Sequence, residues 1–304
     1  MATQLDPLSN PVNPNRWEAA WQSGNRKPRS QPSPVRWKQI SWHAWVGGVL
    51  FSVVVLAAVL APLLAPYPPD QLLPGARLLP PGPAHLFGGD AFGRDLFSRV
   101  LFGAQIALRM SFLAVMLSAV PGIFLGLLAG YYRGWIDQVL SRLMDAWLAL
   151  PGMLFAILII ACTGPSLDGA ILALGLAGIP SYYRLTRATA LSLVQAHYIE
   201  ASRAMGAGGP WIIIRHILPN MLTSLVVLTS LRLGTMLLAG SGLSFVGLGA
   251  QPPDPEWGAL LAEGREYLDV APWVVFFPGA AITLTVCALN LLGDGIRDHV
   301  ARIR

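Results

Sequence analysis

The chain has 304 residues, of which 54% are hydrophobic and only 12% are charged, and its formal net charge is +5. Soluble proteins average about 25% charged residues, so this composition excludes an ordinary soluble domain and indicates a membrane protein. The positive charge does not favour nucleic-acid binding, because Lys27 and Lys38 are the only lysines and the arginines lie mostly between the apolar runs. That distribution is typical of membrane proteins that follow the positive-inside rule.

The first 43 residues are polar and rich in proline, and they carry six basic side chains. They lack the apolar core and cleavage site of a signal peptide. Trp37, Trp42 and Trp45 then mark the belt of aromatic residues that is common at a membrane surface. We therefore expect residues 1–43 to form a cytoplasmic tail and the first apolar helix to be retained as an anchor.

Six apolar runs have about the 20 residues that a helix needs to cross a bilayer. They cover residues 45–64, 108–131, 143–162, 169–190, 222–245 and 273–292. With both termini inside, fifteen of the 21 lysines and arginines lie on the cytoplasmic side and four on the outer side. The sequence predicts an all-α polytopic membrane protein, with a six-helix transmembrane domain over residues 44–304 and both termini in the cytoplasm.

Small residues repeat along the second run, where Gly122, Gly126 and Gly130 are four positions apart and Pro121 lies beside them. Glycines on one face let two helix backbones approach closely in lipid, where no hydrophobic force drives helices together. We expect tight helix packing here, with a kink at Pro121 and a moving gate as the alternative interpretation.

The segment between the fourth and fifth runs, residues 191–220, is too long and too patterned for a passive connection. A short helix that begins near Tyr198 can end at Gly206, since glycine tolerates the left-handed cap conformation. Pro210 suits the first turn of a second short helix, and Pro219 predicts a break before the fifth span. Two short helices around an exposed turn predict a knob that projects from the membrane.

Residues Glu200-Ala201-Ser202, then Gly206, then Ile217-Leu218-Pro219, resemble the E-A-A loop of binding-protein-dependent ABC importer permeases. The third position of that motif is often alanine and is Ser202 here. The resemblance implies a type I importer permease fold, in which this loop holds the coupling helix that docks in a cleft of the ATPase. The coupling residues that it implies are Glu200, Ala201, Ser202, Met205, Gly206, Ile217, Leu218 and Pro219.

Further motifs are similar to those of the dipeptide, oligopeptide and nickel permeases, and to the second of the two permease subunits in such systems. They lie at residues 85–95 with Ser98 and Arg99, and at 130–132, 243–249, 251–258 and 290–295. Two positions depart from the group. Gly89 stands where the outer motif usually has threonine, and Gly240 stands where many members have an acidic residue. If that acidic residue contacts cationic cargo or nickel in other members, its absence argues against such cargo here.

Three of the charged residues in or beside the apolar runs have expected roles. Arg232 lies near the middle of the fifth run, where an arginine costs at least about 2.5 kcal/mol on insertion scales and must face protein or water. It is either a residue of the translocation pathway that meets a peptide carboxylate, or half of a structural ion pair, one candidate partner being another subunit. We expect Arg109 to reach the outer surface from the end of the second span. We expect Asp145 to lie at an interface or helix contact, with a role in coupling as the alternative.

The chain has no G-x-x-x-x-G-K-[ST] loop and no lysine after Lys38, so we expect no ATPase site, no catalytic activity, no cofactor and no metal site. The resemblance implies a homologous permease partner, two ATPase subunits and a periplasmic or lipid-anchored binding protein in a bacterial inner membrane. Peptides are the expected cargo, with glutathione or a nickel chelate as alternatives. An ion-driven secondary transporter and an intramembrane protease are competing classes, but the runs hold almost no carboxylates and no H-E-x-x-H motif.

Overall fold

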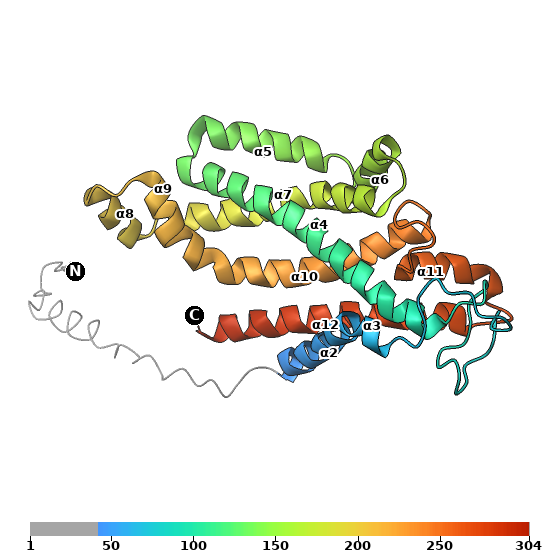
Figure 1. The fold of residues 1–304 in the computed structure, drawn as a ribbon. Helices are drawn as coiled ribbons and strands as arrows, with labels where there is room; N and C mark the ends of the chain where they lie inside the picture. Colours follow the sequence, from blue (N-terminus) through green and yellow to red (C-terminus); the bar gives the residue numbers. More distant parts are fainter. Residues whose placement is uncertain (1–41, 304) are drawn as a thin grey trace, which may run out of the picture. The chain divides into compact units, whose positions relative to one another are not determined.

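The computed structural model describes residues 42–303, and within this range the chain is helical, with no β-strand beyond a single isolated bridge between Gly89 and Asp95 (Figure 1). The all-α fold class is thus confirmed. All but the last two residues of the predicted tail, 1–43, lie outside the described residues.

Each predicted apolar run coincides with a helix or a helix pair. These are α2 (Trp42–Val59), α4 (Leu96–Tyr132), α5 (Gly134–Leu148) with α6 (Gly152–Thr163), α7 (Leu167–Leu193), α10 (Leu218–Phe245) and α12 (Trp273–Ile303). Shorter elements connect them: α3 (Ala61–Leu64), α8 (His197–Ala204), α9 (Gly209–Ile212), the π-helix η1 (Ile213–Ile217), α11 (Trp257–Gly264) and the 3-10 helix η2 (Arg265–Tyr267).

Length and composition alone support fewer spans than the six that the sequence predicts. Among the described residues, four helices are long and apolar enough to cross a membrane, or five if α5 and α6 form one bent span. The helix that fails this test is α7, because Arg184 and Arg187 lower the mean hydropathy of its second half. Many of its residues are buried against other helices instead.

The predicted third span is not one continuous helix. α5 and α6 meet at an angle of 84°, and Pro151 stands at the break. Proline cannot donate the backbone hydrogen bond that a continuous helix needs, and it disfavours helical geometry at Leu150 before it. The long helix expected over residues 143–162 is therefore wrong.

The second span begins twelve residues earlier than expected, at Leu96. Asp95 caps it, since its carboxylate accepts a hydrogen bond from the Ser98 backbone N–H at 2.8 Å. Arg109 therefore lies about 20 Å along α4 at 1.5 Å per residue. Because a helix of 37 residues is longer than a bilayer is thick, the expected place of Arg109 at the outer end of the span stays a prediction. The helix runs on through Pro121.

The glycines of α4 bring its backbone against α7. A Cβ atom added at Gly122, Gly126 or Gly130 would lie within 2.7 Å of a Cβ on α7. The α7 residues that they meet are Tyr182, Thr186 and Ala190, which repeat at the same four-residue interval. This confirms the prediction of tight packing: both helices present one face with matching period, and no larger side chain fits between them.

We predict that Gly126→Ala destabilises the protein by about 1–3 kcal/mol, because the new methyl group would overlap Thr186 and the Tyr183 carbonyl in a packed interface. Gly152→Ala is the matched control, since its added Cβ would meet nothing within 4 Å. Thermal unfolding of the detergent-solubilised protein measures both. Equal unfolding midpoints for the two variants would show that the α4–α7 contact is not tight.

Candidate functional site

The segment between α7 and α10 folds as a knob, by which we mean α8, α9, η1 and the turn between α8 and α9. In Figure 1, α8 and α9 lie at the opposite end of the bundle from α11. The knob has one face packed on the bundle and one exposed face, and the predicted coupling residues divide between them.

Buried isoleucines hold the knob to the bundle. Ile199 of α8, Ile212 of α9 and Ile217 of η1 are fully buried and belong to the largest apolar core cluster, which also contains residues of α4 and α7. Ser202 is buried on the same face, and its hydroxyl donates to the Tyr198 carbonyl at 2.8 Å. Ser202 and Ile217, two predicted coupling residues, thus anchor the knob, and Leu218 is half-buried beside them.

The other predicted residues form the exposed face. The side chain of Glu200 is 83% exposed, and the basic group nearest to it is His197, at 3.9 Å. Ala201 is exposed, and Met205 is 81% exposed. Gly206 follows α8 with a φ of +86° and nothing within 4 Å of an added Cβ, which confirms it as a left-handed cap.

Exposed apolar side chains surround this face. Tyr198, Trp211 and Ile214 are exposed together with Met205. The sequence analysis did not single out Trp211 or Ile214. Large apolar residues in a loop that also holds Arg215 could have indicated an exposed apolar surface. Arg203 and Arg215 are exposed here as well, so the surface combines charged and apolar groups, as a docking surface for a partner protein does.

The knob joins α10 without the predicted break. α9, η1 and α10 follow each other directly, and Gly209–Phe245 counts as one 37-residue helix. Pro219 lies in the first turn of α10, directly after η1, and it is exposed; the helix continues past it although proline cannot donate a backbone hydrogen bond. The expected break at Pro219 is therefore wrong, and a displacement of α9 would pass directly into α10.

Arg232 lies in the middle of α10 and is half-buried. Its Nη2 atom donates to the Ser181 hydroxyl of α7 at 2.6 Å. Asp145 instead pairs with Arg184 at 3.2 Å, and both side chains are exposed. Asp145 thus links α5 to α7, in keeping with the expected helix contact.

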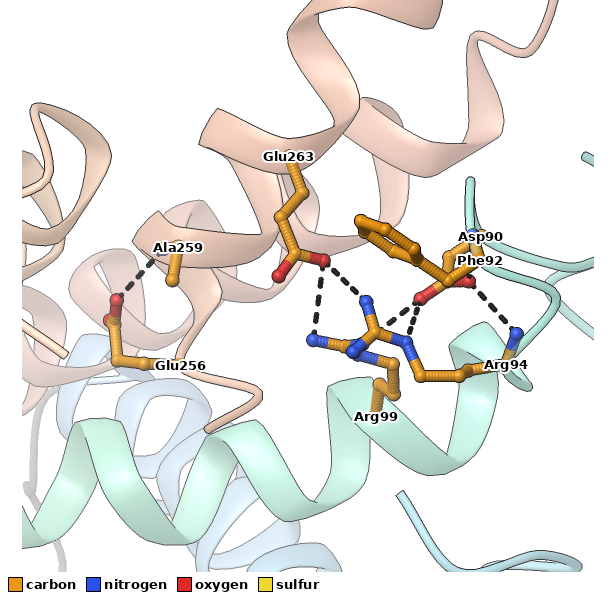
Figure 2. Close-up of polar contacts among 7 residues, drawn as sticks. All are labelled: Asp90, Phe92, Arg94, Arg99, Glu256, Ala259 and Glu263. Carbon is orange, nitrogen blue, oxygen red and sulfur yellow. Dashed lines mark hydrogen bonds and ion pairs between the residues drawn. The ribbon is translucent and has the colours of Figure 1, made fainter. Parts of the chain in front are cut away.

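An ionic cluster joins the segment before α4 to α11, as Figure 2 shows. Arg94 contacts Asp90 at 2.6 Å and Glu263 at 2.7 Å, and Arg99 contacts the same two carboxylates at 3.0 and 3.3 Å. Arg99 is completely buried. The outer motif at residues 85–99 therefore ties the segment before α4 to α11.

Glu256 caps the start of α11 from a fully buried position. Its carboxylate accepts hydrogen bonds from the backbone N–H groups of Gly258 at 2.8 Å and Ala259 at 3.1 Å, and from the Ser241 hydroxyl at 2.7 Å. Burial raises the pKa of Glu256 despite these bonds. Burial also raises the pKa of Glu263, and Arg94 opposes that shift.

The space at Gly240 is already filled in this chain. A Cβ added there would lie 2.2 Å from the terminal methyl of Met110 on α4. An acidic side chain at position 240 would thus displace Met110. No group of three or more His, Cys, Asp or Glu side chains that could hold a metal ion occurs among the described residues.

A bundle of long apolar helices with an anchored knob at one end is the architecture of a polytopic membrane protein. The family model described as "Binding-protein-dependent transport system inner membrane component" matches residues 122–303, and the chain belongs to this family. A second model, the N-terminal TM domain of oligopeptide transport permease C, matches residues 41–81.

Several curated relatives cover most of the chain. The dipeptide transport system permease protein DppC of Alkalihalophilus pseudofirmus is 43% identical and covers 84% of each chain. The glutathione transport system permease protein GsiD of Pectobacterium atrosepticum is 45% identical over 84% of this chain and 86% of its own. The di/tripeptide permease DppC of Pseudomonas aeruginosa is 41% identical over 88% and 91%.

Among solved structures, an inward-facing form of the MetNI methionine ABC transporter is similar in fold. Its TM-score is 0.55 at 22% identity, and the match covers 68% of this chain and 97% of the other. The predicted type I importer permease fold and the predicted family are both confirmed.

We predict that Asp90→Asn destabilises the protein by about 3 kcal/mol, because it removes a carboxylate from two buried arginines and leaves Glu263 alone with both. Asp145→Asn is the control, since it breaks an exposed pair and should cost less than about 1 kcal/mol. Thermal unfolding of both variants in detergent checks the difference. If the two variants unfold alike, the ionic cluster of Asp90, Arg94, Arg99 and Glu263 does not hold the segment before α4 in place.

Proposed function

We propose that this chain is a non-catalytic permease subunit that imports short peptides and is driven by separate ATPase subunits. The observation that carries this proposal is the pair of peptide-transport relatives, at 43% and 41% identity, combined with the anchored knob. The absence of a P-loop from the sequence supports a separate source of energy.

The cargo that fits best is a di- or tripeptide, as the names of these relatives suggest. Glutathione is the second candidate, because a relative named for it is 45% identical. Met110 occupies the space beside Gly240, where the resembling group often has an acidic residue, and this makes a nickel chelate a poorer candidate.

Coupling to ATP would act through the exposed face of the knob. Glu200, Ala201, Met205 and Gly206 are exposed at its tip and leave room for a partner surface to approach closely. The buried isoleucines resist movement of the knob on its own. Because the helix continues from α9 into α10, a movement of the ATPase against the exposed face of the knob would displace α10 as well.

The complete importer would contain a second, homologous permease, two ATPase subunits and a periplasmic or lipid-anchored binding protein. Residues 1–43 would form a cytoplasmic tail and residues 44–304 the membrane domain. The distribution of arginines supports both termini and the knob on the cytoplasmic side of a bacterial inner membrane. The cluster of Asp90, Arg94, Arg99 and Glu263 would then lie at the periplasmic end of the bundle, on the side where the binding protein docks.

The cargo is tested with the intact assembly in proteoliposomes. Labelled dialanine and trialanine should be taken up when ATP and the binding protein are present, and unlabelled peptides should compete better than glutathione or nickel. Uptake of glutathione alone would move the assignment to that cargo. Uptake without ATP would contradict an ATP-driven importer.

We predict that Glu200→Lys lowers peptide uptake at least tenfold and weakens co-purification with the ATPase subunits. The side chain is 83% exposed, so the change leaves the core intact and acts on the partner surface. Glu266→Lys is the matched control, since it makes the same charge reversal at an exposed position after α11. Unchanged uptake and unchanged ATPase binding in the Glu200 variant would exclude the knob as the coupling element.

A further inference from the structure

Arg232 lies in a different environment from the arginines that form ion pairs. The residue is 14 positions from the start of α10 and 13 from its end, so it stands about 20 Å from either end of the helix. At that depth a cation is costly unless it faces water or protein.

Arg232 has no carboxylate partner among residues 42–298, whose side chains the structure describes. Arg94, Arg99, Arg184 and Arg187 each contact an aspartate or glutamate. Arg232 donates only to the neutral hydroxyl of Ser181 within the same residues. The charge of Arg232 is therefore not neutralised within this part of the chain.

Two threonine hydroxyls flank Arg232 on α10, in a stretch that is otherwise mostly apolar. Thr235, nearly one turn further along α10, is exposed, and its hydroxyl donates to the Arg232 carbonyl at 3.0 Å. One turn before, Thr229 accepts a hydrogen bond from Tyr182 of α7 at 3.2 Å. A lipid-facing surface would be apolar, so hydroxyl groups on either side of a cation favour a passage that holds water or cargo.

The donors at this place match a carboxylate. A guanidinium carries five N–H groups in a fixed fork that binds the two oxygens of a carboxylate together. One N–H is used on Ser181. Because the Ser181 oxygen accepts that bond, its own proton is available for an anion.

We propose that Arg232 and Ser181 bind the terminal carboxylate of a peptide during its passage through the importer. This inference rests on the proposed function, since every unmodified short peptide carries that group whatever its side chains. Neutralising the anion at mid-depth lowers the cost of moving it through the membrane, and a charge-assisted bidentate bond is among the stronger hydrogen bonds. A carboxylate of the second permease could occupy the same place, and the experiment separates the two.

The test uses the intact importer in proteoliposomes with saturating binding protein, and compares uptake of labelled dialanine with uptake of dialanine amide. The binding protein is common to all assays, so its own preference cancels when the uptake ratio is compared between variants. Arg232→Gln removes the charge, and Arg232→Lys keeps the charge without the fork. Arg109→Gln is the matched control, since it removes another arginine from the interior of a span helix.

Arg232→Gln should lower dialanine uptake about tenfold and leave amide uptake unchanged or higher, so that the ratio falls about tenfold. Arg232→Lys should restore part of the ratio, and Arg109→Gln should leave it at the wild-type value. A loss of both uptakes with a lower yield of assembled complex would assign Arg232 to an ion pair with the second permease. An unchanged ratio would overturn the inference while the peptide importer stands, whereas an intact assembly that takes up no dialanine would overturn the proposed function as well.

Discussion

The close contact between α4 and α7 is the constraint on which the rest of the structure depends. In lipid, two helices gain little from burying apolar side chains, so they associate through close packing of backbones and small side chains. Gly122, Gly126 and Gly130 provide that approach over more than two turns. The contact fixes the place of α7 beside α4, and α7 carries Arg184, Arg187 and the connection to the knob.

From α7, polar contacts reach two neighbouring helices. Arg187 pairs with Asp137 and Arg184 with Asp145 on α5, while Ser181 and Tyr182 hold α10 through Arg232 and Thr229. α10 in turn continues from the knob without a break. The same helix thus receives the push expected from an ATPase at one end and carries the proposed carboxylate site at its middle, which gives a short mechanical route between them.

The sequence predicted the helical class, the positions of the apolar helices and the glycine contact, because length, hydropathy and four-residue spacing are local properties. It did not predict the bend at Pro151 or the early start of α4 at Leu96, since capping by Asp95 extends a helix beyond its apolar stretch. The resemblance to the E-A-A motif identified Glu200 and Gly206. It could not distinguish the exposed residues of the motif from the buried residues that hold the knob to the bundle. Ser202 and Ile217 are buried because of contacts with distant helices, which no local pattern contains.

The central claim is that the exposed face of the knob meets an ATPase subunit. A photo-crosslinking amino acid at Met205, which is 81% exposed, tests it most directly, with the same probe at the exposed Val270 before α12 as the control. In the assembled importer we expect an adduct with the ATPase subunit from position 205 and none from position 270. An adduct from neither position, or the same adduct from both, would contradict this account of how the permease is driven.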